Sequence, residues 1–157
     1  YLRIYHEAFG LPYICFRYAN VYGPRQGNGG EGGVISIFCE RLQAHKDISI
    51  FGDGGQTRDF VYVDDVVAAN MAALHKPDLV GVINVSTERG TSLNKLVAQF
   101  KKIVDHEFNV HYEEARQGDI KHSLLSTKKM INELGLSATV KLDKGLTTTY
   151  EYFHNKK

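Results

Sequence analysis

The chain has 157 residues, of which 43% are hydrophobic and 24% are charged, and its formal net charge is +1 at pH 7. This length fits one globular domain or the larger part of one. The near-neutral charge argues against nucleic acid or an anionic membrane as a partner, and no apolar run approaches the ~20 residues of a membrane span. The first residues are amphipathic, unlike the basic and then apolar segments of a signal peptide.

Hydrophobic periodicity predicts helices and strands that alternate along the chain. Asp64 or Asp65 is expected to N-cap the third helix, and Gly135 is expected to end a short fifth helix that Ser126 or Thr127 caps. This alternation is typical of an α/β fold with parallel strand pairing. We expect helices over residues 1–9, 34–46, 65–75, 93–106, 127–134 and 143–154, and strands over 11–21, 48–51, 58–63, 80–85 and 110–113.

The N-terminus indicates that the sequence is part of a longer protein. There is no initiator Met, and the first residues already have apolar side chains at helical spacing, ending at Gly10-Leu-Pro12. We therefore expect residues 1–157 to be a fragment of a larger domain.

The cysteines and histidines give no sign of a disulfide or a metal site. Cys15 and Cys39 both lie in apolar runs, so we expect two buried free thiols in a reducing cytoplasm. The seven histidines are scattered, and none has a partner at the spacing of a metal ligand.

The most informative stretch is a strand that runs into a polar turn. Apolar residues from Leu11 to Phe16 are followed by Arg17, Tyr18, Asn20, Tyr22 and Arg25 around the strand break at Gly23-Pro24. Open α/β sheets bind ligands at the carboxyl ends of their strands, so these polar groups mark a candidate site. On the residues alone, Asn20 fits a turn-forming role as well as a binding role, and Tyr18 fits a packed strand position as well as a site.

A glycine-rich run resembles a dinucleotide fingerprint but is better interpreted as a loop. Gly27-Asn-Gly-Gly-Glu-Gly32 matches G-x-G-x-x-G, with Asp53 about 20 residues further on. The first glycine of that fingerprint makes a tight turn at the end of the strand, which aims the helix N-terminus at the pyrophosphate. Here Gly23-Pro-Arg-Gln26 intervenes, so we expect an ordinary flexible loop.

Three blocks carry a resemblance to a known family. Arg17-Tyr-Ala-Asn-Val-Tyr-Gly-Pro-Arg25 is similar to the sixth-strand signature of the extended short-chain dehydrogenase/reductases, the NAD-dependent epimerase/dehydratase family. Ile50-Phe-Gly-Asp-Gly-Gly-Gln-Thr-Arg-Asp-Phe-Val-Tyr-Val-Asp-Asp65 and Arg116-Gln-Gly-Asp-Ile-Lys-His122 are similar to the same family. Within it, the pattern most resembles the nucleotide-sugar epimerases that act on UDP-glucose.

The resemblance implies a site for a UDP-sugar. Asn20 would contact the phosphate region, Arg58 and Arg116 would clamp the diphosphate, and Asp119 would accept a hydrogen bond from a ribose hydroxyl. Guanidinium groups suit this role because their planar fork makes two parallel charge-assisted bonds. From the residues alone, Arg58 could instead be neutralised by a neighbouring acid (Asp59, Asp64 or Asp65), and the segment 115–120 reads as an unremarkable polar loop.

Further residues follow from the same resemblance. Gly33 and Val34 would lie against the diphosphate or the sugar with the free N–H groups of a helix start. Ser49 and Phe51 would hold the uracil, although Phe51 also fits a core position. Tyr18 would line the nicotinamide side of NAD.

The catalytic pair of the family is expected outside this sequence. The resemblance places the family's Tyr-x-x-x-Lys in the missing N-terminal half, and the one match to that spacing here, Tyr152 to Lys156, stands at the far C-terminal end, so no catalytic residue is assigned. The resemblance implies the last elements of a Rossmann-like doubly wound sheet, interleaved with a small α/β substrate-binding domain. The N-terminal NAD-binding half would then be missing, and the fragment alone is expected to be inactive.

We therefore expect the UDP-sugar-binding portion of an NAD-dependent UDP-glucose 4-epimerase-like enzyme, cytoplasmic and homodimeric as a full-length protein. A nucleotide-sugar 4,6-dehydratase or a UDP-glucuronate decarboxylase is one alternative. A non-catalytic module that binds nucleotide sugars is another.

Overall fold

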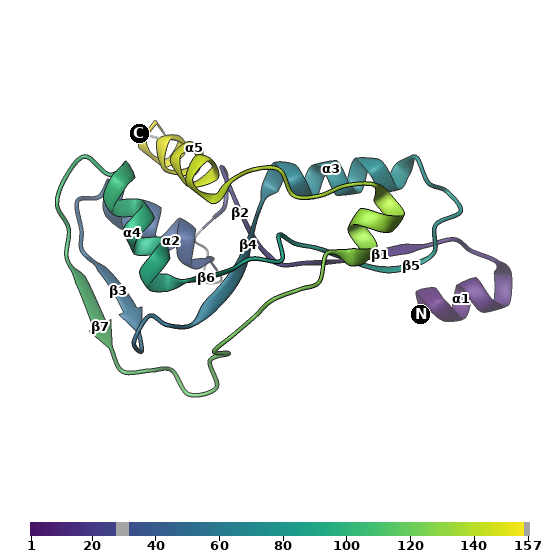
Figure 1. The fold of residues 1–157 in the computed structure, drawn as a ribbon, viewed down its shortest axis with the longest axis horizontal. Coiled ribbons are helices and arrows are strands. Elements are labelled where there is room, and N and C mark those ends of the chain that lie inside the picture. The colour runs from purple at the N-terminus through teal and green to yellow at the C-terminus, as the bar shows by residue number, and fades with distance from the viewer. Residues whose placement is uncertain (28–31, 156–157) are drawn as a thin grey trace.

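The computed structural model of the protein describes residues 1–27 and 32–155. Helices and strands alternate along it, as predicted, and the helices flank short strands (Figure 1). The helices are α1 (Leu2–Phe9), α2 (Val34–Gln43), α3 (Val63–Leu74), α4 (Leu93–Ile103) and α5 (Leu142–His154), with a π-helical turn η1 (Met130–Leu134). The strands are β1 (Ile14–Tyr18), β2 (Asn20–Tyr22), β3 (Ile48–Phe51), β4 (Thr57–Tyr62), β5 (Gly81–Val85), β6 (Gly90–Ser92) and β7 (Val110–Glu113).

The described strands pair in three small sheets, and most pairs are parallel. β1 pairs with β5, β2 with β4, and β3 with β7, all in parallel, which confirms the predicted α/β class with parallel pairing. β6 was not predicted; it lies antiparallel to β4, with Thr57 opposite Ser92 and Arg58 opposite Thr91. β4 is therefore the central strand of the sheet β2-β4-β6.

Two hydrophobic clusters meet at β4. The larger cluster gathers side chains from α2, α4, α5 and β3 and includes Phe38, Phe100 and Leu146. The smaller one gathers β5, α3 and η1 around Ile83. Phe60 belongs to the first cluster and Val61 to the second, because successive strand residues point to opposite faces. Burial on both sides fixes the position of β4, and with it the position of Arg58 near its start.

α5 packs tightly across this central sheet. A Cβ atom on Gly145 would come within 2.9 Å of a ring carbon of Tyr22 and one of Tyr62, so only glycine permits this approach. The burial of Tyr22 raises the pKa of its phenol far above the ordinary value.

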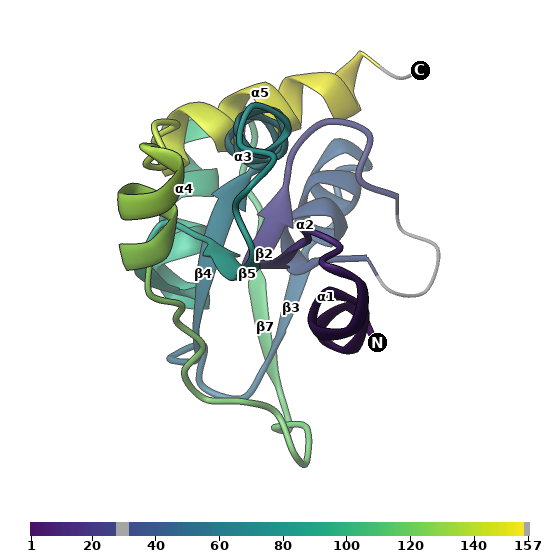
Figure 2. The same ribbon diagram turned by 90° about the vertical axis from the view of Figure 1, so that its right-hand side faces the viewer.

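α1 lies at one end of the molecule, away from α4, α5 and β7 (Figure 1), so it is nearest the viewer in Figure 2, and it contributes no buried residue. It ends at Gly10, which has the left-handed conformation with φ of 69°. None of the helices within the described ranges is both long and apolar enough to cross a membrane.

The strand expected over 11–21 is divided in two, which corrects the prediction. β1 stops at Tyr18 and β2 starts at Asn20, and the two strands pair with different partners. Between them, the Ala19 N–H donates to the carbonyl of Val85 (3.0 Å). The chain leaves one sheet and enters the next at this residue, and a run of β-forming residues cannot indicate such a change of partner.

The predicted caps have mixed outcomes. Gly135 ends η1 with φ of 71°, as expected. Ser92 caps α4 by accepting from the Lys95 N–H. The prediction that Asp64 or Asp65 caps α3 is wrong, since α3 begins at Val63 and both acids lie in its first turn. Asp65 instead accepts from the backbone N–H groups of Thr139 and Val140, a contact far along the chain.

The two free cysteines differ in exposure. Cys39 is buried in α2, and this burial raises the pKa of its thiol to about 12. Cys15 is exposed, so the prediction of two buried thiols is wrong for this residue. Within the described residues, β1 has a partner strand on one edge only, which leaves Cys15 without the cover that its apolar neighbours in sequence led us to expect.

Candidate functional site

A cavity of about 470 Å³ opens between β2, α2, β3, β4 and the loop that follows β7. It brings together seven of the eight residues assigned to the nucleotide sugar from sequence: Asn20, Val34, Ser49, Phe51, Arg58, Arg116 and Asp119. Gly33, the eighth, lines an adjoining hollow of about 260 Å³ together with Asn20 and Val34. Residues up to about 100 positions apart in the sequence therefore surround one space.

Arg58 is held at the cavity by an ion pair. Its Nη2 donates to Asp119 Oδ1 (2.6 Å), and its Nη1 donates to the carbonyls of Thr57 (2.9 Å) and Ile120. The Arg58 side chain is 18% exposed and that of Asp119 is 39% exposed, so the pair lies at the cavity rim with Arg58 on the inner side. Asp119 and the two carbonyls together fix the direction of the Arg58 guanidinium.

The acids close to Arg58 in sequence, Asp59 and Asp65, accept hydrogen bonds from other segments. Asp59 is 1% exposed, and its carboxylate accepts from the Thr87 N–H and hydroxyl and from the Glu88 N–H. Asp65 is used by Thr139 and Val140, as described above. The alternative in which Asp59 or Asp65 neutralises Arg58 is therefore not what the structure shows.

Arg116 lies over the ring of Phe51. Its guanidinium carbon is 3.8 Å from the centroid of the Phe51 ring, within the range of a cation–π interaction. Arg116 and Arg58 come from two different segments, yet both line the same cavity. Two permanent positive charges therefore border it, one paired with an acid and the other stacked on an aromatic ring.

Strand alternation places Ser49 and Phe51 where they lie. Along β3, Ile48 and Ile50 are buried in the core, whereas Ser49 and Phe51 are half-buried. β3 pairs in parallel with β7, which leads into the loop that carries Arg116. In Figure 1 this segment runs from β7 below β4 toward η1.

Asn20 and the start of α2 form another wall. Asn20 is the first residue of β2, and α2 begins at Val34 with Gly33 as its N-cap and no side-chain capping bond. The predicted helix start at Gly33–Val34 is therefore confirmed. Backbone N–H groups of this first turn are suited to an anionic group.

The glycine-rich fingerprint of residues 27–32 lies mostly outside the described residues. The flanking elements are described: β2 ends at Tyr22 and α2 starts only at Val34. Asp53, the acid that the fingerprint would assign to a ribose, accepts from the Gly55 N–H (2.8 Å) within its own turn.

Two glutamines that line the cavity were not singled out from sequence. Gln56 and Gln117 both contribute to the lining. The Gln56 amide donates to the carbonyl of Phe51 (2.7 Å), which closes the glycine turn between β3 and β4. Gln56 directly follows Gly54-Gly55 and stands two residues before Arg58, and this position in the motif is the signal that could have identified it.

Tyr18 is set apart from this cavity. It is the last residue of β1, 45% exposed, and its hydroxyl exchanges hydrogen bonds with the Asn70 side chain (3.0–3.1 Å). It does not line the cavity that holds the other predicted residues. The assignment of Tyr18 to a cofactor rather than to the nucleotide sugar stays a prediction.

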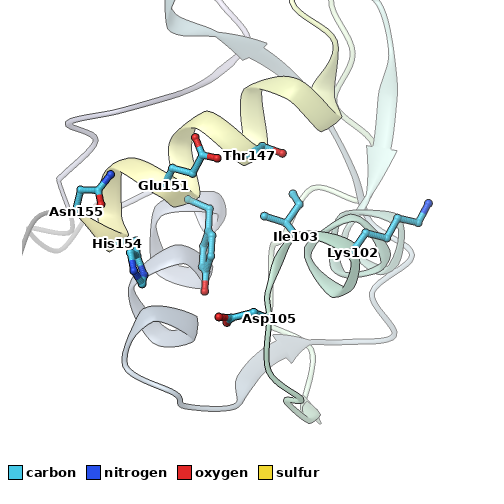
Figure 3. A pocket seen from close by; sticks show the side chains of 8 residues that line it. Lys102, Ile103, Asp105, Thr147, Glu151, His154 and Asn155 are labelled. Atoms are coloured by element: carbon cyan, nitrogen blue, oxygen red, sulfur yellow. The ribbon is translucent and has the colours of Figure 1, made fainter.

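A second hollow, of about 390 Å³, lies between the end of α4 and α5 and holds none of the predicted residues (Figure 3). Lys102, Asp105, Glu151 and His154 border it. The His154 ring bonds the Gln43 side chain (2.9 Å) and so joins α5 to α2, whereas Asp105 bonds its sequence neighbour His106 (3.2 Å).

A network at Asp47 holds β3 and β7 together. Asp47 accepts from the Asn109 N–H (2.8 Å), from His111 Nε2 (3.0 Å) and from the Asn109 amide (3.3 Å). These bonds, the backbone one foremost, keep the pKa of the Asp47 carboxyl below its ordinary value. Since β3 carries Ser49 and Phe51, this network supports one wall of the cavity.

Comparison with known proteins shows the family to which the chain is related. The NAD dependent epimerase/dehydratase family matches residues 1–86. A UDP-glucose 4-epimerase of Mycolicibacterium smegmatis is 38% identical over 156 residues, which cover 99% of this chain and 50% of that protein. A UDP-N-acetyl-alpha-D-glucosaminuronate decarboxylase of Bacillus cytotoxicus is 31% identical over 151 residues, covering 92% of this chain and 47% of the relative.

A solved structure extends the likeness to the fold. The crystal structure of UDP-glucose 4-epimerase with UDP-glucose from Thermotoga maritima has a TM-score of 0.92 and 45% identity, covering 98% of this chain and 49% of that one. The predicted Rossmann-like relationship is thereby confirmed. The chain spans about half the length of the curated relatives it matches.

The chain belongs to the NAD dependent epimerase/dehydratase family. This confirms the resemblance drawn from the three sequence blocks, and NAD, the cofactor expected from sequence, is the one that the family description names. The relatives include epimerases and a decarboxylase, so the family is an enzyme family whose members differ in reaction.

The Asp47 network predicts a loss of stability in acid. A carboxylate with a lowered pKa in the folded state stabilises the fold above its ordinary pKa of about 4 and loses that effect as pH falls through the lower folded value. We expect the free energy of unfolding to decline between about pH 5 and pH 3, and Asp47→Asn to make that decline shallower.

Denaturant unfolding at a series of pH values measures this. Asp78→Asn, at an exposed position, is the matched control and should leave the pH dependence unchanged. An Asp47→Asn variant with the same pH dependence as the unmodified chain would contradict the assignment.

Proposed function

We propose that this chain is the nucleotide-sugar-binding portion of an NAD-dependent UDP-glucose 4-epimerase. The full-length enzyme would interconvert UDP-glucose and UDP-galactose through a 4-keto sugar. The observation that carries the proposal is that Arg58 and Arg116, from separate segments, border one cavity with Asn20. Two guanidinium groups and a neutral amide suit a diphosphate with about two negative charges.

Arg58 and Arg116 would take the diphosphate from two sides. Arg58 is already oriented by Asp119, so part of the entropic cost of fixing its long side chain is met before the ligand arrives. A diphosphate would share or replace the carboxylate as the partner of Arg58, which leaves Asp119 to accept from a ribose hydroxyl. Gly33 and Val34 would add backbone donors near the sugar end.

Ser49 and Phe51 would hold the base. The uracil would lie against Phe51 and bond the backbone near Ser49. The Phe51 ring presently carries the Arg116 guanidinium, so uracil and Arg116 would have to share the two faces of one ring, or Arg116 would have to swing toward the phosphates. If Arg116 swings toward the phosphates, it frees a face of Phe51 for the uracil, so base stacking would be coupled to phosphate binding.

The fit to NAD rests on Tyr18. Its exposed aromatic ring, with the hydroxyl held by Asn70, suits a planar nicotinamide. When bound, NAD would supply the hydride acceptor for oxidation of the sugar at C4. This chain's share would be to hold the diphosphate and base while the sugar remains free to turn. The family's Tyr-x-x-x-Lys for the proton transfer would lie in the N-terminal half, and the one such spacing in this sequence, Tyr152 to Lys156, stands at its C-terminal end, so catalysis would need residues outside the chain.

A sibling reaction is the second candidate. The relationship to a decarboxylase at 31% identity favours keeping decarboxylation and dehydration as alternatives. Thr57-Arg-Asp-Phe60 and the segment 117–122 favour the epimerase. Product analysis of the full-length protein with UDP-glucose and with UDP-glucuronate distinguishes them: UDP-galactose from UDP-glucose supports the epimerase, whereas a 4-keto-6-deoxy product from UDP-glucose, or release of CO₂ from UDP-glucuronate, overturns it. The full-length protein is proposed to be a cytoplasmic homodimer, and a purely binding module remains the third candidate.

The proposed grip predicts the effect of removing either guanidinium. Isothermal titration calorimetry of the 157-residue chain with UDP should show binding that weakens by about tenfold or more in Arg58→Ala and in Arg116→Ala. The reason is that a charge-assisted hydrogen bond contributes about 1.5–3 kcal/mol.

The matched control is Arg3→Ala, whose side chain is 80% exposed and lies outside the cavity. This variant should bind UDP as the unmodified chain does. Equal affinity in all three variants, with unchanged thermal unfolding, would rule out the two-arginine grip.

A further inference from the structure

A separate cavity of about 480 Å³ lies between β6, the first turns of α4 and the segment that leads into α5. None of the residues that line it also lines the candidate UDP-sugar cavity. The two cavities are nevertheless linked by one strand pair, because Arg58 of β4 lies directly opposite Thr91 of β6.

Positively charged side chains gather at this cavity of about 480 Å³. Arg89, Lys95 and Lys141 line it, and Asp143 is the one acid in its lining. Within residues 1–27 and 32–155 none of the three cations forms an ion pair or a side-chain hydrogen bond, whereas Arg3 and Arg58 do. The Asp143 carboxylate accepts from the Lys144 N–H (2.8 Å) rather than from a cation. Unpaired like charges around a hollow repel one another and attract an anion.

Uncharged donors face the same space. Thr91 is 7% exposed and lines the cavity, and its hydroxyl has no hydrogen-bond partner among the described residues. The hydroxyl oxygen is not one of the buried side-chain atoms left without a partner, so it is accessible from outside and available to donate to a ligand. α5, a helix of 13 residues, also begins here at Leu142, with no side-chain cap from Lys141. Its first N–H groups add positive partial charge.

We propose that this cavity binds the phosphate group of a small soluble phosphorylated molecule. Three cations, a hydroxyl and a helix N-terminus supply more donors than a carboxylate with two oxygens can accept, and they suit a dianionic group with three free oxygens. The volume exceeds that of a lone phosphate, so the cavity has room for the organic part of the ligand. This site is independent of the proposed UDP-sugar grip and does not rest on it.

Pyrophosphate is the probe, used on the 157-residue chain that carries Arg58→Ala and Arg116→Ala so that the first cavity cannot contribute. Titration followed by ¹H–¹⁵N NMR should give saturable shifts of the Thr91, Leu142 and Asp143 amide signals. Adding Arg89→Gln, Lys95→Gln and Lys141→Gln together should weaken this binding by about tenfold or more.

The matched control carries the same loss of charge elsewhere, as Lys46→Gln, Lys101→Gln and Lys129→Gln at exposed positions outside the cavity. It should bind pyrophosphate with unchanged affinity. Arg89→Gln and Lys141→Gln alone should each give a partial loss, which keeps the test valid if the triple variant unfolds. The proposal is overturned if the three amides do not shift, or if the cavity and control variants bind equally well.

Discussion

The ion pair between Arg58 and Asp119 is the contact on which the candidate site depends. It joins β4, whose position is fixed by burial on both faces, to the long loop between β7 and η1. The same loop is tied to β4 by the bond of the Thr57 N–H to the Lys121 carbonyl (2.8 Å). Together these bonds keep an otherwise exposed polar loop beside the cavity. Arg116 reaches the cavity because its loop is anchored three residues further on.

The two arginines are prepared for an anion in different ways. Arg58 is oriented by a carboxylate, and a partly exposed pair of this kind contributes at most about 1 kcal/mol, so an incoming diphosphate can compete for it. Arg116 is oriented by the face of Phe51, an interaction of about 0.5–2 kcal/mol that leaves all its N–H donors available. Both arrangements are weak enough to exchange and specific enough to position the groups. A ligand that carries a ring and a diphosphate could use both at once.

Much of this site could be predicted from sequence because its residues lie in compact blocks. Asn20, Arg58 and Arg116 each stand in a motif, and the structure gathers them around one cavity. What escaped prediction depends on contacts far along the chain. The break at Ala19 follows from pairing with β5 and β4, and Asp65 serves residues 139 and 140 instead of its own helix start. β6 is a strand of three residues that exists through its antiparallel pairing with β4. The local secondary-structure propensities of these residues give no information about partners that lie far away in the sequence.

The central claim is that one diphosphate is held jointly by Arg58, Arg116 and Asn20. A crystal structure of the chain with UDP tests it most directly. The account predicts both guanidinium groups within about 3 Å of diphosphate oxygens, with the Asn20 amide beside them. A diphosphate seated in another hollow, or one that contacts neither arginine, would contradict it.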